Sequence, residues 1–420
     1  MIDLTLLLCI ALGFLLGVLS GLTPGLHINN FAAMLLALSP LLLDRGFTAY
    51  HMASIILAAS ISQTFFDVIP AVFVGAPDAD SVLAVLPGHR LMMEGRGIEA
   101  VRLSAFGSAG AVLISLILIV PISRLFYSFN DLLLKYVGVL LLLIALMMIR
   151  TENGPRVEGQ GSLVHLKYKA IAAMLFLTSG VLGSFAMSHE TLFYSPFGLE
   201  PQPLLPLLSG LFGASTLILS LSSSASVPRQ RETKISLPPG ALARSILLGG
   251  LGGSIVAWIP GVSPSLAAMT ARLGTEATGE EFLVSLSGVN TANALFSLIA
   301  LYVIDKPRSG AVAAIKELMP LSQDVLVQMV VTVVAVAAIS YIAAVSLART
   351  VSDVISSLNY RALCLVVLAG LTGMCLAFTG PFGLLIFVIS TTLGLVAPVA
   401  GIKKTHAMGV LMLPLIVYYI

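Results

Sequence analysis

Residues 15–38 read LLGVLSGLTPGLHINNFAAMLLAL, and residues 251–273 read LGGSIVAWIPGVSPSLAAMTARL. Each stretch is an apolar, glycine-rich segment, a Pro-Gly pair, a few small polar residues and a second apolar segment. A shorter echo follows each pair, as DSVLAV at 80–85 and SGAVAAI at 309–315. Agreement in order, spacing and residue type indicates an internal repeat, and such a repeat dominates any prediction of architecture.

The composition places this repeat in a membrane. Of the 420 residues, 58% are hydrophobic and only 10% are charged, whereas roughly a quarter of a soluble domain is charged. Many apolar runs are about 20 residues long, enough to cross a hydrocarbon core of ~30 Å. We therefore predict an all-α, multi-pass protein of the cell membrane with about 10–12 transmembrane helices. A membrane barrel would instead alternate apolar and polar residues along short strands.

The distribution of Lys and Arg predicts the topology, because positive loops stay on the cytoplasmic side. The basic connections 150–169 and 227–244 are expected inside, and the loop 188–203 between them, which has no Lys or Arg, outside. Counting spans outward from these anchors puts the loop 90–102 inside. In the second half, counting back from the basic pair at 403–404, taken as a cytoplasmic loop, puts 305–323 outside. The two repeats are therefore predicted to be inverted.

We divide the chain into a first membrane repeat at 1–150, a connecting unit at 151–240 and a second membrane repeat at 241–420. The connecting unit is expected to hold two membrane helices and the basic cytoplasmic loops. Separate apolar spans are expected within each repeat, for example at 103–123 and 133–149 in the first.

The Pro-Gly pairs predict the substrate site. A break at membrane depth frees backbone groups, which is tolerated only where protein or a watery cavity satisfies them. The freed amides at the start of the next helix carry partial positive charge and suit an anion, and such breaks at matching points of two repeats mark substrate sites in transporters. The expected walls comprise Thr23, Pro24, Gly25, His27, Asn29 and Asn30 on one side, and Pro260, Gly261, Ser263 and Ser265 on the other. The alternative interpretation is two tight turns at the membrane surface.

Two polar clusters interrupt apolar segments at comparable points of the halves. SQTFFDVIP at 62–70 contains Asp67, and SGVNTANALFS at 287–297 contains further candidate substrate ligands, Asn290, Thr291 and Asn293. An ionisable group inside a membrane is costly and usually functional, so Asp67 is the candidate for coupling to H⁺ or Na⁺. The alternatives are an interfacial or Arg-paired aspartate, and ordinary interhelical hydrogen bonds for the amides and threonine.

Other function classes receive no support from the sequence. No GxSxG, Walker, HExxH or paired His/Cys pattern occurs, so we expect no enzyme, no metal site and no cofactor. The net charge of +2 gives no basic surface for nucleic acid. The expected partners are membrane lipid and an anionic solute, transported by alternating access.

Several motifs resemble those of one known family. GLTPGLHINN at 21–30, GAPDADSVLAVLPGHRLMMEGRGIEA at 75–100, LTSGVLGSFA at 177–186 and LLPLLSGLFGAS at 204–215 look like the TctA-type large permease subunit of tripartite tricarboxylate transporters. The C-terminal stretch 379–420 looks closest to an archaeal branch. The resemblance implies a di- or tricarboxylate permease, driven by an ion gradient and accompanied by a small membrane subunit and an extracytoplasmic binding protein.

The chain departs from that family where PGLHINN replaces a small-residue PGxGP pattern, which puts citrate-like substrates and the partner proteins in question. Paired Pro-Gly hairpins also resemble polyprenyl-phosphate translocases, so a flippase for a lipid-carrier phosphate is the alternative function. An intramembrane enzyme or a purely structural protein is the third class. An anion site at broken helix ends would serve a carboxylate or an isoprenyl phosphate.

Overall fold

The computed structural model describes residues 4–23, 28, 32, 35–36, 39–73, 85–152, 162–195, 203–222, 228–259, 264, 267–268, 278–357 and 360–420. These residues form helices and connecting segments, which confirms the all-α prediction. The longer helices are α1 (Leu4–Leu22), α4 (Ala49–Phe66), α7 (Gly97–Arg150), α8 (Ser162–Ser188), α11 (Pro239–Val256), α13 (Gly279–Ile304), α15 (Gln323–Ser357), α16 (Tyr360–Ala400) and α17 (Gly409–Tyr419).

The shorter elements lie mostly at the ends of the long ones. They are α3 (Ser39–Asp44), α5 (Val68–Phe73), α6 (Val85–Met93), η2 (Glu190–Leu192), α9 (Leu204–Leu208), η3 (Ser209–Ala214), α10 (Ser215–Ser222), α14 (Gly310–Leu318) and η4 (Lys404–Met408). Element η3 is a π-helix, and η2 and η4 are 3₁₀-helices.

By length and composition, eight helical stretches of the described residues could cross a membrane, which supports a multi-pass membrane protein. Helices α7 and α16 each have enough residues for two crossings. The spans expected at 103–123 and 133–149 lie in one helix, α7, which continues through Pro121. In α16 the backbone leaves the helical region at Gly380, where φ is +69°. This break divides α16 into two stretches of about 30 Å each.

The helices pack into two compact units, each of which consists of two separate segments of the sequence. Unit one comprises Met1–Phe129 and Ser226–Tyr360, and unit two comprises Asn130–Ala225 and Arg361–Ile420. Packing and sequence repetition divide the chain by different criteria, so the repeat boundaries at 150 and 240 and the inversion of the halves stay predictions.

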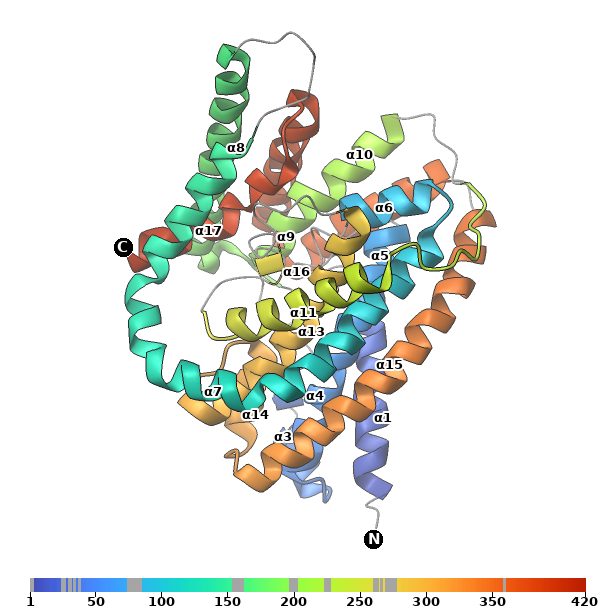
Figure 1. Cartoon of the computed structure of the whole chain (residues 1–420), viewed down its shortest axis with the longest axis vertical. Helices are drawn as coiled ribbons and strands as arrows, with labels where there is room; N and C mark the ends of the chain where they lie inside the picture. The colour runs from blue at the N-terminus through green and yellow to red at the C-terminus, as the bar shows by residue number, and fades with distance from the viewer. Residues whose placement is uncertain are drawn as a thin grey trace. The chain divides into compact units, whose positions relative to one another are not determined.

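Unit one is built around two deeply buried helices. In an apolar 18-residue window of the stretches containing α4 and α13, 94% and 83% of the residues are buried, respectively. Helix α1 packs along α4, and α11 packs along α13 (Figure 1). Glycine permits both close approaches: a Cβ at Gly17 would collide with the carbonyl of Ala59, and one at Gly253 would lie 2.5 Å from the Ala292 Cβ. Small residues at such positions are typical of membrane helix pairs.

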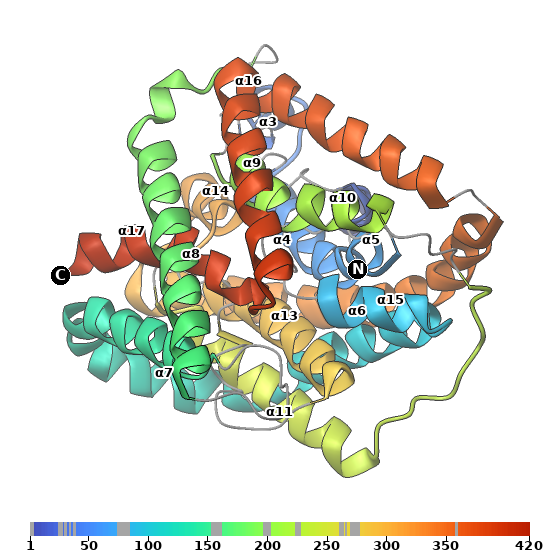
Figure 2. The same cartoon turned by 90° about the horizontal axis from the view of Figure 1, so that it is seen from above.

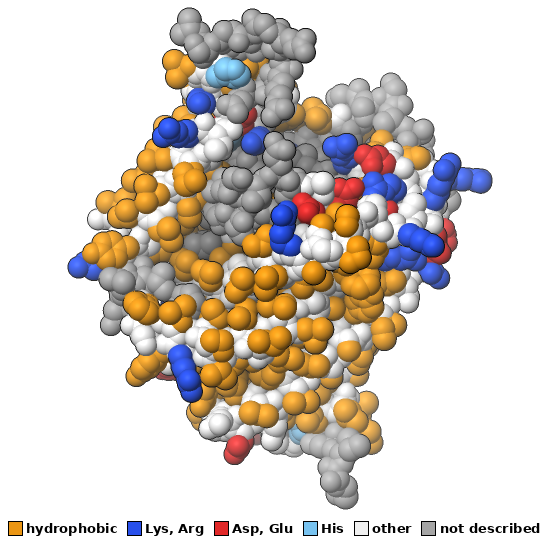
Figure 3. Space-filling model, in the orientation of Figure 1, with side chains coloured by type: hydrophobic (Ala, Val, Ile, Leu, Met, Phe, Trp, Pro, Cys, Tyr) orange, Lys and Arg blue, Asp and Glu red, His pale blue; other side chains and the backbone are white. Residues whose placement is uncertain are grey.

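Hydrophobic side chains cover much of the face of unit one shown in Figure 3, and charged side chains gather near α6. Ion pairs there join Arg90 to Glu94 and Arg349 to Glu232. A surface with an apolar belt and a charged end suits a helix bundle that faces both lipid and water.

The segment 228–238, expected as a basic loop, is tied to the start of α7 in unit one. Its Arg231 amide donates to the Gly95 carbonyl at 2.8 Å. The buried Glu99 carboxylate accepts from the Thr233 hydroxyl at 2.6 Å and the Ser236 amide at 2.8 Å. Arg96 donates to the same carboxylate at 2.9 and 3.0 Å. The basic connection is therefore a bound strap on unit one.

In unit two, α8 packs against α17, which crosses it (Figure 2). The close approach depends on Gly183, where a Cβ would collide with the Val410 carbonyl. Lys404, taken from the sequence as part of a cytoplasmic loop, is only 8% exposed. Its ammonium is enclosed by oxygen atoms from η3 and α10, and the cytoplasmic position of this loop stays a prediction.

Candidate functional site

The helix α4 carries Asp67 to the centre of unit one. At its start, the Thr48 hydroxyl accepts from the His51 amide and the His51 ring accepts from the Thr48 amide, both at 3.2 Å. This reciprocal capping satisfies amides that a helix start leaves unpaired. At its end Asp67 forms the turn into α5, so its side chain projects where two helical segments meet.

The helix α13 places the second polar cluster opposite the first. A capping box between Thr278 and Glu281 begins this helix. Asn290 and Thr291 then fall near its middle, 4% and 0% exposed. Because both helices are buried in unit one, the two polar clusters meet away from water.

Two hydrogen bonds join the clusters. The Asn290 Nδ2 donates to Asp67 Oδ2 at 2.8 Å, and the hydroxyls of Thr64 and Thr291 lie 2.9 Å apart. Asp67 is only 4% exposed. Asn290 and Thr291 therefore make hydrogen bonds between helices, which was the alternative interpretation of these side chains. A role of Asn290, Thr291 and Asn293 in substrate binding stays a prediction.

A small cavity of about 40 Å³ lies beside these bonds. Oxygen and nitrogen groups make up much of its wall. Its lining residues are Ile28, Ser60, Gln63, Thr64, Asp67, Asn290, Asn293, Ala294, Ser297 and Ser309. A volume of this size can hold water or a small ion, and it is too small for a tricarboxylate. Carboxylate, amide and hydroxyl oxygens are ligands that hard cations accept.

Ile28 connects this cavity to the first Pro-Gly stretch. Its backbone N–H donates to Gln63 Oε1 at 3.2 Å, and its side chain is 4% exposed. Since Ile28 stands between two predicted substrate ligands in the sequence, the stretch following Pro24-Gly25 approaches Asp67 at this residue. Thr23 is described at the end of α1, where its amide donates to Leu19 and Ser20 carbonyls.

The other hairpin residues lie outside the described part of the chain. They are Pro24, Gly25, His27, Asn29, Asn30, Pro260, Gly261, Ser263 and Ser265. Their role in substrate binding stays a prediction.

The site predicted from sequence omitted several cavity residues. Gln63 and Thr64 were noted as part of the polar cluster, whereas Ser60 and Ser309 were not considered at all. The signal for the first two is a polar side chain one turn before Asp67 on the same helix. Ser309 begins α14 as its N-cap, so its sequence position suggests only a capping role.

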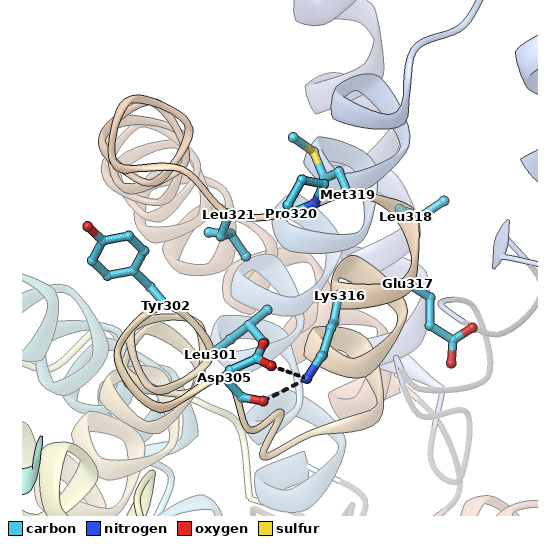
Figure 4. A pocket seen from close by; sticks show the side chains of 9 residues that line it. All are labelled: Leu301, Tyr302, Asp305, Lys316, Glu317, Leu318, Met319, Pro320 and Leu321. Carbon is cyan, nitrogen blue, oxygen red and sulfur yellow. Dashed lines mark hydrogen bonds and ion pairs between the residues drawn. The ribbon is translucent and has the colours of Figure 1, made fainter.

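A larger hollow of about 480 Å³ lies elsewhere in unit one, at the ends of α13 and α14 (Figure 4). Lys316 donates there to the carbonyl of Asp305 at 2.7 Å and lies 2.9 Å from its carboxylate. The charged groups are partly or largely exposed, and Leu301, Tyr302 and Leu321 supply apolar lining. The ion pair satisfies Lys316 locally, so this hollow is a weaker candidate than the buried cavity at Asp67.

The comparisons with known proteins agree with these observations. The pattern of the family described as "Tripartite tricarboxylate transporter TctA family" matches residues 7–409. The chain belongs to this family. It is a transporter family, which agrees with the prediction that the chain is not an enzyme. The chain is also 24% identical to an uncharacterized protein of Methanocaldococcus jannaschii, with 99% of each chain covered. No solved structure matches it.

Membership of the TctA family makes this chain a permease of the tripartite tricarboxylate type. Permeases of this family normally work with the other subunits of a tripartite system and a substrate-binding protein. In this permease, the described residues show the chemistry of the buried polar cavity in unit one.

Proposed function

We propose that this TctA-family permease transports an anionic solute of the di- or tricarboxylate class, and that Asp67 couples transport to H⁺ or Na⁺. The observation that carries the coupling is the Asp67–Asn290 bond inside a buried polar cavity. In an apolar protein, the charge of a buried carboxylate is expensive even where hydrogen bonds compensate part of it. A proton or a sodium ion would neutralise it.

The cavity also suggests how binding of the coupling ion at Asp67 would affect binding of the anionic solute. Neutralisation of Asp67 weakens its charge-assisted bond with Asn290, which joins α4 to α13. Ile28 lies on the same cavity and belongs to the stretch that carries the proposed anion ligands. A change at the carboxylate would therefore reach the hairpin through Gln63 and the Ile28 amide.

Binding to the purified chain tests this proposal without depending on partner proteins. Thermal stability in detergent would be measured with succinate, citrate and an isoprenyl phosphate, each with and without Na⁺ and at several pH values. Ligands that bind only the folded chain raise its melting temperature. We expect a carboxylate to do so. Stabilisation by the isoprenyl phosphate alone would instead favour a lipid-carrier flippase.

The substitution Asp67→Asn is expected to keep the fold and the Asn290 contact while removing the dependence of binding on Na⁺ or pH. Asp353→Asn is the matched control, because Asp353 is exposed on α15. Binding in Asp67→Asn that retains the full dependence on cation and pH would remove Asp67 from the coupling mechanism.

Replacement of Gly25 or Gly261 by Leu tests the proposed anion site separately. A bulky side chain denies an anion close approach to the backbone amides, so carboxylate stabilisation should be lost in both variants. The cation dependence of the melting temperature reports on Asp67 and should remain. Retained carboxylate binding in both variants would contradict the hairpin site.

A further inference from the structure

Unit two contains a second buried ionisable centre, which neither the family nor the proposed transport site explains. Lys404 begins η4 and is only 8% exposed. Its ammonium donates to the Phe212 carbonyl at 3.1 Å and to the hydroxyl oxygens of Ser215 and Thr216, both at 2.7 Å. A lysine ammonium has three N–H donors, and these three oxygens match them. We call the oxygens of Phe212, Ser215 and Thr216 the oxygen cage.

The oxygen cage offers Lys404 only hydrogen-bond acceptors, because its hydroxyl groups donate their own protons to the local backbone. Ser215 Oγ donates its own proton to the Leu211 carbonyl, and Thr216 Oγ1 donates to the Phe212 carbonyl, both at 2.6 Å. Each hydroxyl therefore has only acceptor capacity left for Lys404. These residues follow directly on the π-helix η3, a type of element often found at functional sites.

An all-acceptor cage is a site for a cation. One carbonyl and two hydroxyl oxygens are ligands that a small monovalent cation accepts in place of water. The ring of Phe212 adds to the attraction, since Lys404 Nζ lies 5.8 Å from its centroid.

A carboxylate holds the turn that carries Lys404. Glu152 Oε2 accepts from the Lys403 amide at 3.0 Å and lies 2.9 Å from His406 Nε2. Glu152 and His406 are 3% and 1% exposed. One carboxylate oxygen thus fixes the chain on both sides of Lys404, which directs its side chain into the cage.

The charged and titratable groups around Lys404 are few. Glu152, Lys403 and His406 lie on or against the same turn. The neighbouring stretches 170–188, 209–222 and 362–400 contain no charged residue in their sequences. His406 Nδ1 is buried without a hydrogen-bond partner among the described residues. The balance of charge at this centre therefore depends on the protons of Lys404 and His406.

We propose that the oxygen cage is a monovalent-cation site which this chain fills with its own ammonium group, so that proton binding and release at Lys404 add and remove a positive charge in the cage. Burial supports the exchange of this proton, because it lowers the pKa of Lys404 to about 7. A lysine that served only to fill space could be replaced by an apolar residue at lower desolvation cost. The proposal concerns unit two alone and does not depend on Asp67 or on the solute.

Removal of the ammonium should open the cage to a soluble cation. The full chain with Lys404→Ala would be purified in detergent without substrate. Its melting temperature would be followed against NaCl, methylammonium chloride and choline chloride at equal ionic strength. We expect a saturable rise with Na⁺ or methylammonium over choline at pH 6, absent from the wild type, whose cage is filled by the protonated Lys404 at this pH. Equal curves for all three salts in Lys404→Ala would overturn the proposal.

The double variant Lys404→Ala/Ser215→Ala identifies the cage as the site of the effect. Loss of one oxygen ligand should raise the half-saturating cation concentration by about tenfold. Thr178→Ala replaces Ser215→Ala in the control, because the Thr178 hydroxyl also donates to its own helix but lies on α8. An unchanged half-saturating concentration in the double variant would place the cation elsewhere.

If Lys404→Ala does not fold, Ser215→Ala in the otherwise native chain carries the test. Loss of an acceptor from the cage disfavours the ammonium, so the pH dependence of the melting temperature should move to lower pH. The same change in Thr178→Ala should not move it. A permanently charged, purely structural Lys404 would leave the profile of Ser215→Ala in place and contradict the proposal.

Discussion

At the scale of the single residue, burial of Lys404 disfavours its charged form, and this makes the stability of the protein depend on pH. Its pKa is lowered to about 7 by desolvation, from an ordinary value of 10.5. Between these values the unfolded chain holds more protons than the folded chain, so stability rises with pH. Below pH 7 both states are protonated and this contribution is constant.

We therefore expect the melting temperature of the wild type to rise between pH 7 and pH 10 relative to that of Lys404→Met. Within this window one proton changes the free energy of unfolding by at most about 1.4 kcal/mol per pH unit. The three oxygen acceptors stabilise the ammonium form of Lys404. They therefore reduce the difference between its folded and unfolded pKa values, which narrows the pH range over which stability rises. Thermal unfolding at a series of pH values measures the difference. Lys167→Met, an exposed position on α8, is the control and should follow the wild type.

At the scale of elements, the strap 228–238 depends on the buried carboxylate of Glu99. This carboxylate joins Arg96, Thr233 and Ser236 at distances between 2.6 and 3.0 Å. Replacement by Ala removes the acceptor from all three, and a buried group left unpaired costs about 1–3 kcal/mol. The strap should then open locally before the helices unfold.

Limited trypsin digestion of purified Glu99→Ala should accordingly cleave faster after Arg231 and Lys234 than digestion of the wild type. Glu94→Ala is the control, because Glu94 is 39% exposed in its side chain and its ion pairs lie at the surface. Equal cleavage rates in the Glu99 and Glu94 variants would show that other contacts hold the strap.

The sequence predicts elements better than it predicts their partners. Long apolar runs identified the membrane helices, because their signal is local. The polar clusters of α4 and α13 were also recognised, since each interrupts its own apolar run. The bond between Asp67 and Asn290 joins residues 223 positions apart. No local pattern indicates such a pairing.

The burial of Lys404 was not predicted either. Two adjacent lysines between apolar spans are typical of a cytoplasmic loop, and Lys403 and Lys404 were interpreted in this way. The oxygens that enclose the Lys404 ammonium lie 188 to 192 positions earlier in the chain. The Pro-Gly motifs predicted a site, and the stretch after the first motif reaches the cavity at Ile28. The π-helix beside Lys404 has no sequence signature that we recognised.

At the scale of the whole molecule, the inverted repeat is the main prediction to test. It requires the loop 90–102 and its counterpart 305–323 to lie on opposite sides of the membrane. Arg90 and Glu317 are exposed positions in these two loops. Cysteines introduced there report on their sides, since Cys9, Cys364 and Cys375 are all buried.

We expect Glu317→Cys to react with a membrane-impermeant thiol reagent in intact cells and Arg90→Cys to react only after permeabilisation. Leu192→Cys, in the loop predicted outside, and Thr151→Cys, in a loop predicted inside, calibrate the two sides. The physical basis is retention of basic loops in the cytoplasm. Lys316 is paired with Asp305, which reduces the conflict posed by a basic residue in an external loop. Labelling of Arg90→Cys and Glu317→Cys from the same side would mean that the two halves run parallel.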